Sequence, residues 1–389
     1  MNRQTDIIIV GGGMVGGSLA LALAQHSNLK ISLLESRPPA RLQQNDPWQL
    51  RVSAINSASQ QLLTELGVWQ RLTPSRLGPY EQMQVWEKNS QLDFFAADIG
   101  AAWLGHIIEN GHLEQAIFEA LKATKSIALL SPAKATALNE QTITLDNGDQ
   151  LSAPLIIAAD GGQSQVRDWA GIKSRGWAYH QQGLVAVVET EHPHQQCARQ
   201  HFLPGGPLAF LPLNNPHQCS IVWSLPDTEA EHQKNVDDLA FCEQLASAFD
   251  FRLGSVRLLS ERVAFPLNLQ HAEAYVKPGL ALVGDAAHSV HPLAGQGVNL
   301  GFQDAKVLAD ILLKAHQQGR PLGSLHTLKK YQRAQLAENT LMQLSMDGLN
   351  RLFSNQLPGV ASLRQFGLKQ VNQLGFIKKM LIQQAAGRR

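Results

Sequence analysis

The stretch DIIIVGGGMVGG at residues 6–17 decides the fold of this chain. Its first half is apolar and predicts a short buried strand, and the small residues that follow the glycines predict a helix. Between them the sequence reads GxGxxG at Gly11, Gly13 and Gly16. In this pattern the first glycine permits a tight turn, the second lets the backbone approach a pyrophosphate, and the third lets the helix pack on the strand. The N-terminus of such a helix faces the phosphate charge.

A second strand completes a βαβ unit after this helix. Residues 30–35 (KISLLE) are mostly apolar and end on Glu35, 19 residues after Gly16. A carboxylate at the end of this strand can accept hydrogen bonds from ribose hydroxyls. A lone GxGxxG also marks ordinary tight turns, but strand, helix and acid together predict nucleotide binding. The pattern does not separate NAD from FAD.

The composition is that of an ordinary globular protein. The 389 residues are 44% hydrophobic and 17% charged, and this length suits two or three domains of roughly 150 residues each. A net charge of +1 argues against a nucleic-acid-binding protein, which normally has a strong basic excess. The three cysteines form no CxxC pair, so we expect neither a zinc site nor a disulfide framework, and a cytoplasmic location. There is no apolar run of about eighteen residues that would predict a membrane-spanning helix.

Two further glycine-containing motifs follow predicted strands. Asp160 begins a DG pair directly after the strand PLIIAA (residues 154–159), although a polar turn that caps a helix also explains such a pair. The third motif is GDAAHSVHPLAGQGVN at residues 284–299. Its Asp285 ends a buried strand, where the carboxylate can accept a hydrogen bond from a cofactor hydroxyl. The glycines near the end of this motif bring backbone N–H groups to the start of a helix.

Two histidines in the third motif raise the question of a metal site. His288 and His291 are three residues apart, so one helix face can carry both. Proline follows immediately, and apart from Asp285, which is expected at a cofactor hydroxyl, no acidic third ligand lies nearby. The sequence therefore predicts a polar loop packed on a cofactor rather than a metal site.

Together the three motifs, over residues 1 to about 350, resemble the fingerprints of the class A FAD-dependent aromatic hydroxylases, the para-hydroxybenzoate hydroxylase type. The chain is more closely similar to the bacterial ubiquinone-biosynthesis hydroxylases, through the segments RVSAINSAS, LGHIIEN, AFLPL and CSIVWSL. Residues 198–225 look most like the 2-polyprenylphenol hydroxylase branch. Residues 11–26 and 346–359 look more like the branch that acts on a later, methoxylated quinol.

The resemblance implies FAD as the cofactor and assigns residues to it. Residues of the first βαβ unit would bind the ADP half: Gly11, Gly13, Met14, Val15, Gly16 and Glu35. Arg51 and Gln115 match cofactor contacts in the family, whereas the residues alone suggest a surface arginine and a solvated helix glutamine. Asp160 would link FAD to the nicotinamide donor, and Asp285 would bind the ribitol chain. The third motif would line the isoalloxazine ring with Pro292, Gly295, Gln296, Gly297, Val298 and Asn299.

The chain changes character between residues 176 and 268. The segments there are short, β-rich and interrupted by Pro, Gly and Asn, which predicts an antiparallel sheet. The predicted fold class is therefore α/β: a Rossmann-type FAD-binding domain with an inserted antiparallel β-sheet substrate domain and a helical C-terminus. The predicted boundaries are 1–75, 98–175 and 269–340 for the first domain, 76–97 and 176–268 for the second, and 341–389 for the C-terminal segment.

The C-terminal segment 341–389 is strongly basic. It holds seven Lys and Arg residues against one acid, Asp347, and its apolar residues have helical spacing. A basic amphipathic helix can lie on an anionic membrane surface. A helix that packs on the core of its own protein or on a sister subunit has the same pattern. Both interpretations remain open at the level of sequence.

The resemblance also implies the reaction. The enzyme would hydroxylate the aromatic ring of a polyprenylated phenol or quinol in ubiquinone biosynthesis, using NAD(P)H and oxygen through a flavin hydroperoxide. A 2-polyprenylphenol is the preferred substrate, and the later methoxylated quinol is the alternative. A flavin-dependent prenyl-chain reductase and a non-catalytic FAD-binding subunit of a biosynthetic complex are rival functions. Water must be excluded from such a site, and the inserted sheet would form its roof.

No catalytic base can be named from the sequence. His291 and the Pro292 carbonyl are candidates to accept from or orient the phenol. His180, His201 and His217 are further candidates, each of which a structural role explains as readily. The expected partners are the prenylated substrate, a membrane surface at its inner face reached through residues 341–389, and a biosynthetic complex or a second copy of the chain.

Overall fold

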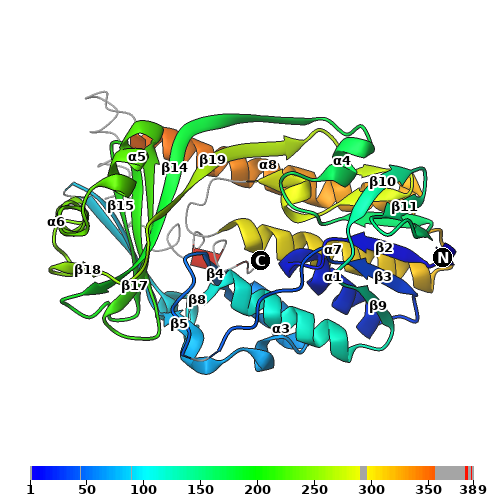
Figure 1. Ribbon diagram of the computed structural model, residues 1–389, viewed down its shortest axis with the longest axis horizontal. Coiled ribbons are helices and arrows are strands. Elements are labelled where there is room, and N and C mark those ends of the chain that lie inside the picture. The colour runs from blue at the N-terminus through cyan, green and yellow to red at the C-terminus, as the bar shows by residue number, and fades with distance from the viewer. Residues whose placement is uncertain are drawn as a thin grey trace.

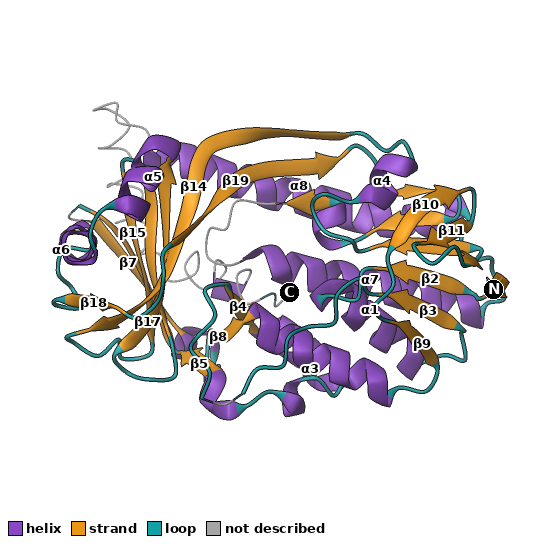
Figure 2. Ribbon diagram, viewed as in Figure 1, coloured by secondary structure: helices purple, strands orange, loops and turns teal. Residues whose placement is uncertain are grey.

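The computed structural model describes residues 2–43, 45–88, 90–289, 296–354, 382, 383 and 387. Within these ranges it describes the side chains of residues 4–340, except 296, and of 382, 383 and 387. Two large sheets lie at opposite ends of the molecule, and the long strands β14 (Ser174–Thr190) and β19 (Val263–Ala272) connect them along one edge (Figures 1 and 2). This arrangement confirms the predicted α/β class with its additional β-rich part.

The first large sheet has six strands in the order β20-β21-β13-β2-β3-β9. All neighbouring pairs are parallel except β20 with β21. Four of its strands are wholly buried and, apart from Ser32, apolar, as expected for a parallel sheet that is covered on both faces. The strands are β2 (Ile7–Val10), β3 (Ile31–Leu34), β9 (Ile127–Leu130), β13 (Leu155–Ala158), β20 (Val276–Lys277) and β21 (Leu280–Leu282).

Helices and a small sheet complete this end of the molecule. Helix α1 (Met14–Gln25) packs against both α3 (Asn110–Ala123) and α7 (Gln296–Gln317) (Figure 1). Helix α8 (Leu325–Ser354) packs along α7. A four-stranded sheet has the order β1-β12-β11-β10 and comprises β1 (Asn2–Gln4), β12 (Gln150–Ser152), β11 (Thr142–Leu145) and β10 (Ala135–Asn139).

The second large sheet has nine strands, mostly antiparallel, in the described part of the chain. The main path runs β22-β19-β14-β17-β16-β15-β6-β7, and β18 pairs with β14. Strands β6 and β7 come from residues 82–95, so two distant parts of the sequence build this sheet. The remaining strands are β6 (Gln82–Glu87), β7 (Ser90–Phe95), β15 (Cys197–Leu203), β16 (Gly206–Pro212), β17 (Gln218–Pro226), β18 (Val256–Leu258) and β22 (His288–Ser289).

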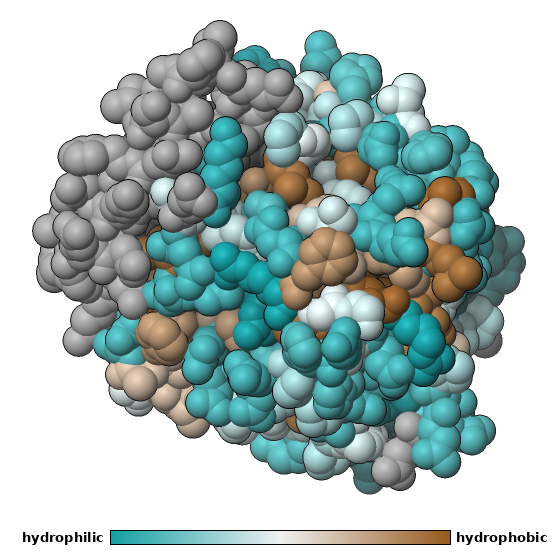
Figure 3. Space-filling model, turned by 90° about the vertical axis from the view of Figure 1, so that its left-hand side faces the viewer, coloured by the Kyte–Doolittle hydropathy of each residue, from teal (hydrophilic) through white to brown (hydrophobic). Residues whose placement is uncertain are grey.

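The two faces of this second sheet have different neighbours. Alternate residues of a strand point to opposite faces. Leu184, Ala186 and Val188 of β14 pack in one buried cluster with residues of α6 (Asp238–Ala248). The residues between them point to the inner face, toward the rest of the molecule. The outer end, which also carries α5 (Asp227–Asn235), is covered mostly by hydrophilic side chains (Figure 3).

A third sheet lies between the two large ones. It is antiparallel, in the order β4-β8-β5, and comprises β4 (Val52–Asn56), β8 (Gly105–Glu109) and β5 (Leu77–Tyr80). Ala54 and Ile107 of this sheet are buried with Val187 of β14, which ties it to the inner face of the second large sheet. The short helices are α2 (Ser57–Glu65), α4 (Gln165–Trp169), η1 (Trp69–Arg71), η2 (Pro74–Arg76), η3 (Ala96–Ile99) and η4 (Gly284–Ala286).

Part of the C-terminal segment packs on the chain's own core. Helix α8 continues through residue 354, and Ile382 is buried in a cluster with Ala96 and Leu104. The basic residues beyond Ser354, namely Arg364, Lys369, Lys378, Lys379, Arg388 and Arg389, lie outside the described residues. Within the described ranges, the helices are too short or too polar to cross a bilayer.

Candidate functional site

The glycine-rich turn after β2 brings three backbone segments into contact. Gly11 has a φ of +104°, and a Cβ there would lie 2.3 Å from the Ala159 carbonyl oxygen. A Cβ at Gly16 would lie 2.0 Å from the Gly11 carbonyl oxygen. These two glycines are therefore required by the packing of β2, β13 and α1 on one another.

Gly13 differs from its two neighbours in the motif. Among the described residues, a Cβ at Gly13 would meet no atom within 4 Å, so this residue faces open space there. Gly13 is the N-cap of α1, yet no side chain caps the helix and its first turn holds no acid. The first N–H groups of a helix have no partner within the helix, and they carry partial positive charge. The start of α1 is thus an available site for an anionic group.

Two cavities meet at this helix start, and both are lined by Gly13, Ala159 and Gln163. One has a volume of about 480 Å³ and holds Glu35 in its wall. The other has a volume of about 740 Å³ and includes Asp285. A cofactor with a nucleotide half and a ring half joined by a pyrophosphate fits this arrangement, with its phosphates beside Gly13.

Two backbone N–H groups position the Glu35 carboxylate in the smaller cavity. Oε2 accepts a hydrogen bond from Gly12 N at 2.8 Å, and Oε1 accepts one from Arg37 N at 2.8 Å. An ionised carboxylate can accept about four hydrogen bonds, so two positions remain for ribose hydroxyls. The side chain is half-buried, which leaves it accessible to a ligand.

The larger cavity contains two opposite charges. Asp285 lies in η4, directly after β21, and its side chain is exposed to the cavity although protein surrounds it. Desolvation raises the pKa of the Asp285 carboxyl, whereas the charges of His288 and Arg51 lower it. Arg51 lines the same cavity, with its guanidinium 5.8 Å from the centre of the Phe265 ring. The cavity therefore presents an acceptor and a cation to a polar ligand.

The large sheet contributes an apolar wall to the same cavity. Its described lining residues carry no ionisable side chain; apart from Ser289 of β22 they are Gly183, Val185, Val222, Phe265, Pro266 and Leu267. Val185 belongs to the inner-facing set of β14, opposite the residues that pack on α6. Such a wall can contact an apolar ring and exclude water.

Three of the candidate histidines lie away from this cavity lining. The His201 ring stacks on Trp86 at 4.8 Å between centroids, and its Nδ1 is bonded to the Ala248 carbonyl. His217 Nδ1 is bonded to the Thr190 carbonyl, and His180 is exposed on β14. These histidines have the structural or surface roles that the sequence allowed.

Several predicted cofactor residues use their side chains on the protein itself. Asp160 lines the smaller cavity, but its carboxylate accepts hydrogen bonds from Ser164 Oγ and from Val166 N at 3.1 Å, which holds the start of α4. This is the polar turn that caps a helix. Gln115 accepts a hydrogen bond from Leu42 N at 3.0 Å, which holds the loop after β3 rather than a cavity wall.

Some residues of the third motif line the larger cavity, and others are buried in the core. Gly297 and Val298 line the larger cavity, as do Met14 and Val15 of α1. The Asn299 side chain is buried; it donates to the Ala54 carbonyl at 2.8 Å and accepts from Asn56 N at 3.1 Å, which ties α7 to β4. Gln296 begins α7. His291, Pro292 and Gly295 lie outside the described residues.

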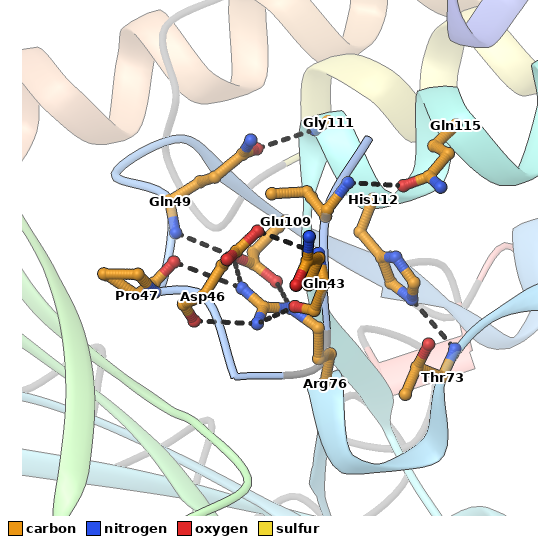
Figure 4. Close-up of polar contacts among 11 residues, drawn as sticks. Gln43, Asp46, Pro47, Gln49, Thr73, Arg76, Glu109, Gly111, His112 and Gln115 are labelled. Atoms are coloured by element: carbon orange, nitrogen blue, oxygen red, sulfur yellow. Dashed lines mark hydrogen bonds and ion pairs between the residues drawn. The ribbon is translucent and has the colours of Figure 1, made fainter. Parts of the chain in front are cut away.

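A buried ion pair that the sequence did not reveal orders the loop before Arg51 (Figure 4). Arg76 Nε donates to Glu109 Oε2 at 2.7 Å, and both side chains are almost fully buried. Arg76 also donates to backbone carbonyls of residues 43, 46 and 47, while Glu109 accepts from Gln49 N at 2.7 Å. Leu50 and Arg51 follow directly and line the larger cavity. Arg76 and Glu109 are 33 residues apart, and no periodicity links them.

Comparisons with known proteins agree with this geometry. The profile of the family "FAD binding domain" matches residues 4–343. The 3-demethoxyubiquinol 3-hydroxylase of Escherichia coli (strain K12) is 40% identical, over 99% of each chain. Ubiquinone hydroxylase UbiL of Rhodospirillum rubrum is 37% identical, over 99% of this chain and 90% of its own. The structure of p-nitrophenol 4-monooxygenase PnpA from Pseudomonas putida DLL-E4 has the same fold, with a TM-score of 0.79 at 17% identity over 100% and 99% of the two chains.

Replacing Glu109 by alanine tests the buried ion pair. The Arg76 charge would remain buried without its partner, so the free energy of unfolding should fall by about 3–5 kcal/mol. The control is Glu189→Ala, which breaks an exposed ion pair with Arg257 and should cost less than about 1 kcal/mol. Urea unfolding followed by tryptophan fluorescence measures both. Equal losses for the two variants would show that the buried pair has no special role.

Proposed function

We propose, from the premise that this chain belongs to the FAD-binding domain family and is an FAD-dependent monooxygenase, that it hydroxylates the ring of a polyprenylated quinol in ubiquinone biosynthesis. The observation that carries the proposal is the larger cavity, which has helix N-termini and charged groups on one side and a wall without ionisable groups on the other. The names of full-length relatives at 37–40% identity support the substrate class.

We propose that the residues around the two cavities bind FAD. Gly13 and the first N–H groups of α1 would bind the pyrophosphate, and Glu35 would bind the adenosine ribose in the smaller cavity. Asp285 would bind the ribitol chain in the larger one, with Arg51 beside it. When bound, FAD reduced by NAD(P)H supplies the chemistry that activates oxygen.

The inner face of the large sheet would hold the ring of the substrate. Val185, Val222 and Leu267 offer dispersion contacts and no hydrogen bonds, so they favour an apolar ring and its prenyl chain over a carboxylated one. The same side chains keep water from the reacting atoms. This wall provides no base to remove a phenolic proton, so the substrate hydroxyl must be oriented from elsewhere in the site.

The relatives bear on which ring is hydroxylated. Sequence segments alone favoured a 2-polyprenylphenol, with a later quinol as the alternative. A relative named 3-demethoxyubiquinol 3-hydroxylase, 40% identical over 99% of each chain, supports the later quinol. We therefore propose a demethoxyubiquinol as substrate and treat the 2-polyprenylphenol as the second candidate.

Substitution of Asp285 by alanine should yield protein that purifies largely without yellow flavin. The loss of a hydrogen bond to a charged group weakens binding by roughly 10–150-fold. Flavin absorbance per mole of protein measures the effect, with Asp310→Ala, which breaks an exposed ion pair with Lys306, as the control. An Asp285→Ala protein with full flavin content would remove Asp285 from the cofactor site.

The proposed reaction can be tested with oxygen-18 gas. Purified protein with FAD, NAD(P)H and a short-chain demethoxyubiquinol should give a product that carries one labelled oxygen atom, and a 2-prenylphenol should react more slowly. A reversed order would favour the other branch. Labelled oxygen found only in hydrogen peroxide with both substrates would contradict the hydroxylase assignment. Reduction of the prenyl chain without oxygen would instead identify a prenyl reductase.

A long prenyl chain keeps such a substrate in the bilayer, so we propose that the protein binds the inner membrane surface through residues 341–389. This segment has a net charge of +6, and each basic residue near an anionic surface contributes ~1 kcal/mol. The protein should therefore sediment with phosphatidylserine vesicles at low salt and be released at high salt. Lys378→Glu combined with Lys379→Glu should weaken binding. Equal binding to neutral vesicles would exclude this electrostatic mode.

A further inference from the structure

A buried aspartate that the function above does not use lies beneath the turn that carries Asp285. Asp304, in α7, is fully buried and its carboxylate has four hydrogen-bond donors around it. Oδ2 accepts from Gly284 N at 2.9 Å and from His288 Nε2 at 2.6 Å. Oδ1 accepts from Gln335 Nε2 at 2.8 Å and from Asn339 Nδ2 at 3.2 Å, both on α8.

The two bonds to Oδ2 reach both ends of one short segment. Gly284 begins the turn after β21 with a left-handed φ of +59°, and His288 ends it four residues later. Gly284, Ala286, Ala287 and His288 are buried, so Asp285 is the residue of this segment whose side chain faces the cavity. One oxygen atom of Asp304 thus holds the segment on either side of Asp285.

The partner of Asp304 is an imidazole with a raised pKa. Burial alone would lower the pKa of His288, but the charge and the hydrogen bond of Asp304 raise it above its usual value. The Tyr275 ring lies parallel to His288, with 5.8 Å between centroids. The charge of Asp285 also raises the pKa of His288, so the buried pair and Asp285 interact electrostatically.

A purely stabilising role would explain little of this arrangement. The attraction within a buried ion pair is largely offset by desolvation, so such a pair is weak evidence for stability. An amide at position 304 would present an NH2 group to one of the two donor pairs, because a carboxylate alone can accept at both oxygens. Two hydrogen-bond donors from the turn and two from α8 converge on this side chain, and only a carboxylate can accept hydrogen bonds from all four.

We propose that Asp304 and His288 are positioning residues for FAD: together they hold the turn of residues 284–288 so that the Asp285 carboxylate is presented to the cofactor. Neither side chain needs to touch FAD. The inference rests on the proposed role of Asp285 in FAD binding. It predicts that Asp304 affects FAD affinity only through Asp285.

The first test measures FAD dissociation constants of the full-length protein, by titrating deflavinated protein and following flavin fluorescence. Asp304→Asn keeps the shape of the side chain and should weaken FAD binding at least about tenfold, as expected when a charged hydrogen bond is lost. His288→Gln should act in the same direction. Asp310→Asn is the matched control, because Asp310 is an exposed residue of the same helix that pairs with Lys306. It should leave the affinity unchanged.

A double-mutant cycle separates positioning from general destabilisation. If Asp304 acts through Asp285, then Asp304→Asn in an Asp285→Asn background should change the affinity less than about twofold. If Asp304 had a merely structural role, the fold-losses of FAD affinity caused by the two substitutions would instead multiply. Gln335→Leu removes a donor to Oδ1, so it should lower the urea midpoint but change FAD affinity less than about twofold.

The outcomes are distinct. A folded Asp304→Asn protein that binds FAD as tightly as the unchanged protein overturns the inference, and so does a full second loss in the Asp285→Asn background. If the Asp304→Asn protein does not fold, His288→Gln replaces it in the double-mutant cycle with Asp285→Asn. The same results for FAD affinity then support or overturn the inference. If Asp285→Asn alone leaves FAD affinity unchanged, the proposed cofactor role of Asp285 fails first, and the positioning role fails with it.

Discussion

The close approach of three backbones at the end of β2 is the constraint on which the rest of this structure depends. A Cβ at Gly11 or Gly16 would lie 2.3 Å or 2.0 Å from a carbonyl oxygen, so any side chain there would force β2, β13 and α1 apart. Their contact directs the unpaired N–H groups of α1 at the junction of the two cavities. Gly284 extends the same packing, because a Cβ there would lie 3.2 Å from Val15. The start of α1 at Gly13 and the turn that carries Asp285 are thereby set relative to one another.

The second large sheet forms the side of the larger cavity that faces Arg51 and Asp285, and it does so with a strand that also builds its own core. Because side chains alternate along a strand, β14 packs Leu184 and Ala186 with α6 on one face and offers Val185 to the cavity on the other. The core of the β-rich part and the wall of the site are therefore two faces of one strand. The described ionisable side chains that line the larger cavity, Arg51 and Asp285, come from the rest of the fold. This division suits chemistry on an apolar ring that must be kept from water.

The candidate cofactor site was partly predictable from sequence, and two of its predicted residues make contacts that the sequence did not indicate, for a common reason. The strands, the glycine turn and the positions of Glu35 and Asp285 follow from short contiguous patterns, and the structure places both carboxylates in cavity walls. Gln115 and Asn299 were expected at the cofactor, yet their amides bond to the backbone of other segments. An amide side chain bonds to whichever backbone group lies within reach. That choice depends on how loops and helices from distant parts of the chain are packed.

The sequence by itself determined the nucleotide-binding βαβ unit and the α/β class, because these depend on glycines and apolar runs whose effect is local: a missing Cβ or a buried strand acts on its immediate neighbours. The family and FAD followed from the resemblance of the three motifs together, since the glycine pattern alone does not separate NAD from FAD. Only the tertiary structure decided which charged groups act together. Arg76 meets Glu109, and Asp304 meets His288 and the Gly284 amide, across segments that no period or spacing connects. A buried charge is stable only where its partner and its hydrogen-bond donors converge. That convergence is a property of packed sheets and helices, and it is absent from the linear order of residues.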